Sequence, residues 1–232
     1  MKLITRVLFV GGIIVSSLAQ AQVGNNIGTL NESLRVTGRY KDTEGSPFLI
    51  DDYTSGTLID KTGNKRAVFL KYDTYKEELL VFNDGTPLMI DKRLYPKFTI
   101  EYVDGTTKKS YAFTNEIQVP GLKPDKYVQM LVDGDTFKFF KTYDAVLNQS
   151  QDQGYGGVVT NNYFENRESY YIYQVGLDAV EVKLKNKDVL KALSDDGAIK
   201  DFLKKEKLKI RNEEDMIEFV EILNTDKSPL ND

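Results

Sequence analysis

KRAVFLKYDTYKEELLVFND, residues 65–84, is the stretch that decides the fold predicted for this chain. Two runs of branched and aromatic residues flank the polar sequence DTYK at 73–76, as the arms of a β-hairpin flank their turn. Successive side chains of a strand point to opposite faces of a sheet, and both faces of the first arm are largely apolar. A strand with two apolar faces needs cover on both sides. We therefore expect this hairpin to lie at the centre of a sheet.

Three Asp-Gly dipeptides, at 84–85, 104–105 and 133–134, separate further runs that have the two-residue period of β-strands. Asp-Gly favours tight hairpin turns because Gly takes the positive φ that such turns require. Around the second dipeptide, Phe98 and Ile100 face Tyr111 and Phe113 on the returning arm, so one face is aromatic and buried. The pattern predicts an antiparallel meander of about eight to ten strands over residues 34–184.

The strand pattern has one long interruption. Residues 148–168 are rich in Asn, Gln and Gly, and we predict a long exposed loop there. Strands at 169–175 and 179–184 then close the sheet. After residue 185 the apolar period changes to that of helices, and three amphipathic helices are expected over 186–224. The third has Asn212 at its N-cap position, followed by acids in its first turn.

The predicted fold class is therefore α+β, an antiparallel β-meander followed by a small C-terminal helical segment. Its expected parts are a signal peptide at 1–21, a sheet domain at 22–185, a helical segment packed on it at 186–224, and a flexible tail at 225–232.

Residues 1–21 have the pattern of a secretory signal peptide. Lys2 and Arg6 precede an apolar run at 7–18, and Ala19-Gln20-Ala21 gives the small-x-small motif of a cleavage site. The apolar run of about a dozen residues is shorter than the ~20 that span a bilayer, so we expect no transmembrane segment after cleavage. The expected location is the periplasm, the outer membrane surface or the extracellular space. Cysteine is absent, which excludes a lipid-anchored lipoprotein and disulfide bonds.

Composition also limits the chemistry. The chain has 31 Lys and Arg against 35 Asp and Glu, and loss of residues 1–21 leaves 29 against 35, a net charge of −6. This acidity disfavours nucleic acid as a partner. Histidine is absent together with cysteine, which removes Ser-His and Cys-His catalysis and His-ligated metals. We expect no cofactor and no metal.

Two groups of residues are candidates for a site. The first is a cluster of aromatic residues that could stack on sugars or contact a protein, or alternatively pack in the sheet core. Its members are Tyr163, Phe164, Tyr170, Tyr171 and Tyr173. The second comprises Asp51, Asp52 and Glu78 near the 65–84 hairpin. Two acids about 5 to 9.5 Å apart can hydrolyse a glycosidic bond, whereas isolated acids are solvated surface groups.

Charge is segregated along the predicted helices. Residues 183–211 contain ten Lys and Arg against five acids, and residues 212–232 contain one Lys against seven acids. Docking of one helix on another explains this pattern; recruitment to an anionic envelope surface is the alternative.

Three motifs carry a resemblance: SPFLIDDY at 46–53, LKYDTY at 70–75, and YYIY at 170–173 before the Lys-rich helices. With them the chain resembles β-rich exported proteins of Bacteroidota, which implies export but no particular activity. A looser similarity of architecture is to envelope carriers that shelter a lipid in a curved sheet. The leading hypothesis is a non-enzymatic exported module that binds or scaffolds an envelope protein, glycan or lipid. The alternatives are a carboxylate-dependent hydrolase and a lipid or lipoprotein carrier.

Overall fold

The computed structural model of the chain describes residues 29–30, 39–83, 85–154, 157–193, 196–225 and 228–229. The expected signal peptide, residues 34–38 at the start of the expected meander and most of the expected C-terminal tail lie outside the described residues.

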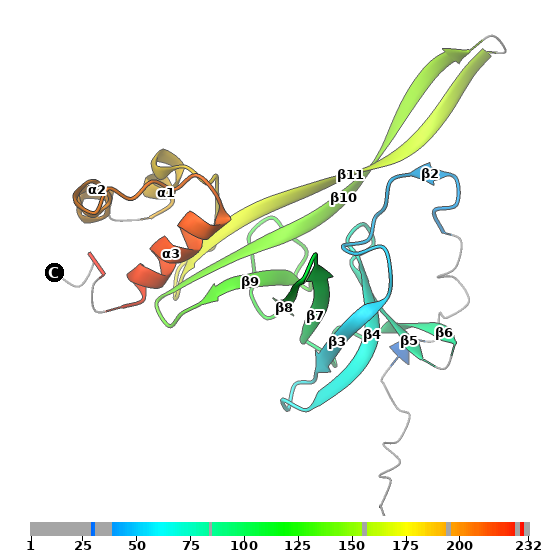
Figure 1. Ribbon diagram of the computed structural model, residues 1–232, viewed down its shortest axis with the longest axis horizontal. Coiled ribbons are helices and arrows are strands. Elements are labelled where there is room, and N and C mark those ends of the chain that lie inside the picture. Colours follow the sequence, from blue (N-terminus) through cyan, green and yellow to red (C-terminus); the bar gives the residue numbers. More distant parts are fainter. Residues whose placement is uncertain are drawn as a thin grey trace, which may run out of the picture.

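One mixed, mainly antiparallel sheet of twelve strands forms most of the described protein (Figure 1), with three short helices after it. The strands are β1 Thr29–Leu30, β2 Thr43–Glu44, β3 Thr54–Ile59, β4 Lys65–Asp73, β5 Glu78–Asn83, β6 Thr86–Ile90, β7 Lys97–Asp104, β8 Thr107–Thr114, β9 Val128–Asp133, β10 Phe137–Gly154, β11 Gly157–Gln174 and β12 Val180–Val182. Their order is β1-β6-β5-β4-β3-β7-β8-β9-β10-β11-β12, and β2 pairs in parallel with β11. The α+β class is confirmed, with more strands than predicted.

The hairpin at 65–84 is β4 and β5, and it lies inside the sheet between β3 and β6 as predicted. Its turn is stabilised by Asp73, whose Oδ1 accepts hydrogen bonds from the backbone N–H groups of Tyr75 and Lys76 at 3.0 and 2.8 Å. The prediction that both faces are covered is wrong in one place. Phe69 and Phe82, which oppose each other across the two strands, remain 57% and 44% exposed.

The glycines of all three Asp-Gly dipeptides lie between paired antiparallel strands. Gly85 and Gly105 have φ values of 80° and 61°, which confirms the reason given for Gly at the first two turns. Gly134 is not among the residues with positive φ, so that reason is wrong for the third. Gly is needed there for space, because a Cβ atom on Gly134 would lie 2.2 Å from the side-chain Cγ of Asn224.

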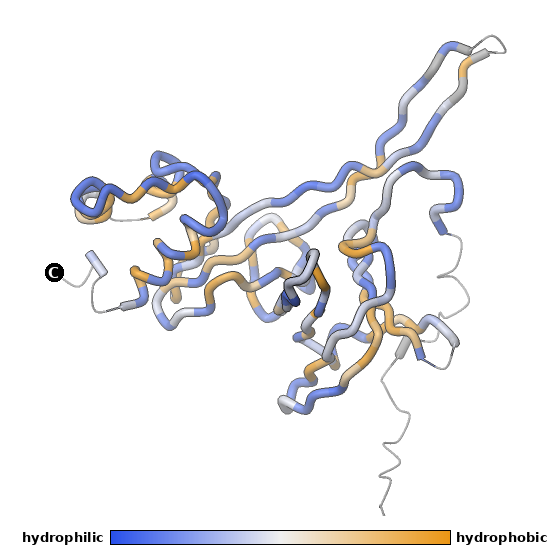
Figure 2. The backbone as a smooth tube through the Cα atoms, in the orientation of Figure 1, coloured by the Kyte–Doolittle hydropathy of each residue, from blue (hydrophilic) through white to orange (hydrophobic). Residues whose placement is uncertain are grey.

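The prediction of a long exposed loop at 148–168 is wrong. The strands β10 and β11 pair without interruption from Phe137↔Gln174 to Gly154↔Gly157, and their far end projects from the sheet as a two-stranded ribbon (Figure 1). The tube view shows that this projecting end is mostly hydrophilic (Figure 2). Neither face of this projecting end is buried, so its sequence has no apolar alternation, and the strand signal on which the prediction depended is missing there.

Three hydrophobic clusters hold the protein together. The first lies among β3–β8 and includes a parallel stack of Phe98 on Phe113 with ring centroids 4.6 Å apart. The second joins the base of the ribbon to the helices, where Phe137 and Phe139 belong to one cluster with apolar residues of all three. The third lies on the other face of the ribbon around Phe140.

The helices begin close to the predicted residues. They are α1 Asn186–Ala192, α2 Asp196–Lys205 and α3 Glu213–Leu223. The predicted cap of α3 is confirmed, because the Asn212 side chain accepts a hydrogen bond from the backbone N–H of Asp215 at 2.8 Å. At the other end of α3, the Asn224 amide accepts from the N–H of Phe137 and donates to its carbonyl. This residue fixes α3 to the start of β10.

Candidate functional site

The five aromatic residues predicted as a binding row lie on β11, but they point to both faces of the strand. The rings of Tyr170 and Tyr171 stack on Phe139 and Phe140, at centroid distances of 5.8 and 5.5 Å. Tyr171 is buried, and Tyr173 is half-buried against the same cluster. The structure therefore places these three in packing contacts with the sheet and the helices.

The other two aromatic residues of that group lie farther along β11. Phe164 is buried, and its ring contacts those of Tyr40 and Tyr75 at 5.2 and 5.3 Å. Tyr163 is 37% exposed and is the most accessible of the five. The Phe164 contacts attach the ribbon to the turn between β4 and β5.

The three candidate acids lie near the β4–β5 hairpin and have cationic neighbours. Glu78 forms an ion pair with Arg39. Asp51 and Asp52 are exposed and lie close enough to Lys71 to favour its charged form. Burial is the larger influence on that lysine, and it lowers the pKa of Lys71. Glu78 is therefore ion-paired and the two aspartates attract Lys71, and neither observation adds support to the hydrolase alternative.

A surface that the sequence analysis did not identify lies on the outer face of β4 and β5. We call Phe48, Tyr53, Phe69 and Phe82 the outer aromatic patch. The Tyr53 ring lies 5.2 Å from that of Phe82 with a 44° tilt, and Lys71 places its Nζ atom 3.9 Å from the centre of the Phe48 ring. The only sequence signal was Lys71 on the same strand face as Phe69, since a lysine at that position indicates that the face is not fully buried.

Hydrogen bonds from the β4–β5 turn fix the segment that carries half of this patch. Thr74 donates from its backbone N–H and from its hydroxyl to the carbonyl of Pro47, each at 2.8 Å. The N–H of Leu49 donates in turn to the carbonyl of Tyr72 at 3.0 Å. Phe48 lies between these bonds, so its ring is held against the outer face of β4.

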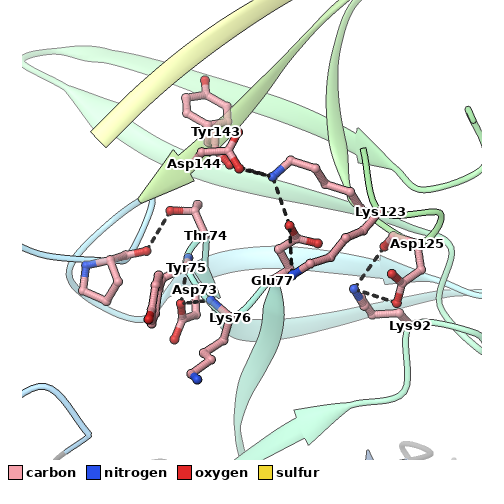
Figure 3. A network of polar contacts seen from close by, with 12 residues as sticks. Asp73, Thr74, Tyr75, Lys76, Glu77, Lys92, Lys123, Asp125, Tyr143 and Asp144 are labelled. Carbon is pink, nitrogen blue, oxygen red and sulfur yellow. Dashed lines mark hydrogen bonds and ion pairs between the residues drawn. The ribbon is translucent and has the colours of Figure 1, made fainter. Parts of the chain in front are cut away.

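A buried polar network lies behind the same turn (Figure 3). Lys126 is 3% exposed, and its Nζ contacts Oε1 of Glu77 at 3.2 Å and Oδ1 of Asp144 at 2.6 Å. It also donates to the carbonyl of Tyr143 at 3.2 Å. Glu77 has a left-handed φ of 58°, which is uncommon for a residue other than Gly. One oxygen of this buried carboxylate, Oε2, has no partner among the described residues.

The position of this network indicates what it does. Glu77 belongs to the β4–β5 turn, Lys126 to the connection before β9, and Asp144 to β10. A single ammonium group therefore bridges two carboxylates from different parts of the sheet. The left-handed backbone at Glu77 turns its side chain inward to this contact. The network fixes the hairpin that presents the outer aromatic patch.

A second buried lysine connects the ribbon to the helices. Lys141 on β10 contacts Oε2 of Glu213 on α3 at 2.8 Å, and Tyr170 donates to the same carboxylate at 3.1 Å. Burial favours the neutral form of this lysine, but its bonds to Glu213 and Tyr143 outweigh burial and raise the pKa of Lys141. Burial also raises the pKa of Tyr143, to about 12. Both groups keep their usual protonation state near neutral pH.

Comparison with known proteins adds no relative: no family model, no curated protein and no solved structure matches the chain. Among the described residues, no helix has the length and apolar character needed to cross a membrane. The same residues contain no group of three or more Asp and Glu arranged to hold a metal ion.

Proposed function

We propose that the chain is an exported, non-enzymatic binding module of the envelope or extracellular space, and that a partner protein docks on the outer aromatic patch. One observation carries this proposal. Phe69 and Phe82 are 57% and 44% exposed although they form a directly opposed pair on two internal strands. Large exposed apolar side chains grouped in this way mark interaction surfaces.

The chemistry of the patch favours a protein over a glycan. The 44° tilt between the rings of Tyr53 and Phe82 gives no flat platform on which a sugar could stack. An aromatic centre bordered by charged groups is typical of protein interfaces. Asp51 and Asp52 are exposed on the segment that also carries Phe48 and Tyr53. We therefore expect the partner to present an apolar side chain to Phe69 and Phe82 and basic side chains to the two acids.

Rigidity of the surface supports the same conclusion. The patch lies on strands paired on both sides, its covering segment is fixed by Thr74, and its turn is anchored to Lys126. A surface that is already ordered loses little conformational entropy when a partner binds. The two exposed phenylalanines are then the expected centre of the binding energy.

Photo-crosslinking in the native host tests the proposal. A photoreactive phenylalanine analogue at position 69 should form a covalent adduct with a distinct protein, and the F82S substitution should remove that adduct. The same analogue at Val103, which is 67% exposed on β7, is the matched control and should give no such adduct. D51K and D52K should weaken the adduct, because they reverse the charge beside the patch.

Two results would contradict the proposal. One is the same adduct from positions 69 and 103. The other is an adduct at position 69 that survives F82S while thermal unfolding shows that the variant is folded. The variant should be folded, because Phe82 is too exposed for its loss to cost much stability.

A further inference from the structure

A groove of about 420 Å³ lies on the C-terminal helical segment, between α1, the end of α2 and the residues after α2. In Figure 1 these helices lie at the opposite end of the molecule from β4 and β5. Leu190, Leu203 and Leu208 give the groove an apolar floor. Lys200, Lys204, Lys207 and Lys209 form its rim. We call this the lysine groove.

The four rim lysines are exposed cations without anionic partners in the part of the chain that the structure describes. None of them takes part in an ion pair between described residues. Lys200 and Lys204 are four residues apart on α2, a spacing at which like charges repel on a helix. The sequence thus concentrates positive charge at this position in a chain with a net charge of −4.

Lys207 adds a second, independent observation. The N–H of Leu208 bonds to the carbonyl of Leu203, and the N–H of Lys207 bonds to that of Lys204, which together form a Schellman motif at the end of α2. In this motif the residue at the position of Lys207 has a left-handed backbone and is usually Gly. Lys207 has a φ of 55°. A lysine there is unfavourable for the backbone, and it places a fourth cation on the rim.

The contribution of lysines to helix stability explains only part of this pattern. Lys204 and Lys205 are in the last turn of α2, where a cation interacts favourably with the helix dipole. That effect does not require the left-handed residue Lys207, nor Lys209 beyond it. An apolar floor with a cationic rim matches a ligand that has a hydrocarbon chain beside an anionic group.

We propose that the lysine groove binds the head group and the upper acyl chain of an anionic phospholipid, and so attaches the protein to the surface of an anionic bilayer. The four ammonium groups contact phosphate oxygens, and the three leucines contact the first methylene groups of the chain. The buried residues Ile199 and Leu203 hold α2 on the hydrophobic cluster, so the helix itself stays in the fold. A nucleic acid fits less well, because it has no hydrocarbon chain to cover the three leucines of the floor.

Vesicle sedimentation with the full chain tests this site. The protein should bind vesicles that contain about a quarter phosphatidylglycerol in phosphatidylcholine, and not phosphatidylcholine alone, with affinity that falls as salt is added. The K204Q/K209Q variant should bind at least tenfold more weakly. Its matched control is K187Q/K205Q, which removes two exposed lysines of the same helices that do not line the groove. The control should change binding about twofold or less.

The K207G variant separates a binding role from a structural one. Gly suits the left-handed backbone, so the thermal midpoint should stay the same or rise. Loss of one rim charge should still weaken vesicle binding about fivefold.

Three results would overturn the proposal. The first is equal weakening by the two double variants, which would indicate unspecific attraction. The second is unchanged vesicle binding by K207G. The third is binding of poly-glutamate without any binding to phosphatidylglycerol vesicles, which would assign the groove to an acidic polypeptide.

Discussion

The two large hairpins of this protein, β4–β5 and β10–β11, have the same backbone hydrogen bonding and opposite sequence character. In β4–β5 the side chains of Leu70, Tyr72, Leu79 and Val81 are at most 1% exposed. In the projecting half of β10–β11 the residues that oppose each other are mostly polar, and Gln149 donates to Asn162 across the ribbon at 3.0 Å. Hydrophobic burial therefore stabilises the first hairpin, and strand pairing with polar side-chain bonds maintains the second.

The hairpins are also connected to each other. Phe164 of β11 contacts Tyr75 in the β4–β5 turn, and Lys126 bonds both Glu77 of that turn and Asp144 of β10. An isolated two-stranded hairpin is at best marginally stable in water. The ribbon is long because it is attached to the sheet, the helices and the other hairpin from its base as far as Phe164, and only its end projects beyond these contacts.

The largest expected effect comes from the same substitution made in both hairpins. L70A removes a side chain that is 0% exposed at the centre of β4 and should lower the free energy of unfolding by about 3 kcal/mol. L147A removes a side chain that is 39% exposed on β10 and should cost less than about 1 kcal/mol. Urea unfolding monitored by circular dichroism measures both. Similar losses for the two variants would show that burial does not distinguish the hairpins.

This contrast explains which parts of the fold were predictable from sequence. Alternating apolar residues identified β4, β5, β7 and β8, and a change of period identified the helices, because in these elements a buried face leaves a pattern. The end of the ribbon beyond Phe164 buries neither face, so its sequence resembles that of a loop. Its pairing is decided by backbone hydrogen bonds, to which every residue except Pro contributes alike.

The candidate site was less predictable, for a related reason. Tyrosines that were adjacent in sequence, Tyr170 and Tyr171, point to opposite faces and pack separately. The outer aromatic patch combines residues from 48 to 82, and exposure of Phe69 depends on how far the covering segment reaches. The contact between Glu77 and Lys126 spans 49 residues and has no local sequence signal.

Substitution of Lys126 tests the connection between the hairpins, and it should lower the free energy of unfolding by an intermediate amount. K126M leaves the carboxylates of Glu77 and Asp144 without their shared cation. Loss of one partner of a buried pair costs about 3–5 kcal/mol. We expect about 2 kcal/mol, since Asp144 is 42% exposed and Lys123 lies 3.6 Å from Glu77.

The double variant E77Q/K126M is the control for this prediction, because it removes the uncompensated charge on Glu77. It should be more stable than K126M alone, and a thermodynamic cycle that includes E77Q gives the coupling energy. Additive effects of the two substitutions would show that the ion pair does not join the hairpins.

The smallest expected effect concerns acid, and it separates the turn between β3 and β4 from the polar part of the ribbon. Asp60 accepts hydrogen bonds from the Thr62 hydroxyl, the Asn64 side-chain amide and the backbone N–H groups of both residues. These bonds, above all the one from the Thr62 hydroxyl, lower the pKa of Asp60 to about 2. A carboxylate whose pKa is lower in the folded state stabilises the fold above its unfolded value of 3.8. That contribution should be lost as the pH falls from about 4 through about 2. The Gln149–Asn162 bond at the ribbon has no titrating group and should be insensitive to this change.

Carboxyl chemical shifts across this range should show the low midpoint at Asp60, and D60N should remove the corresponding pH dependence of stability. A midpoint near 4 for Asp60 would contradict the hydrogen-bonded turn.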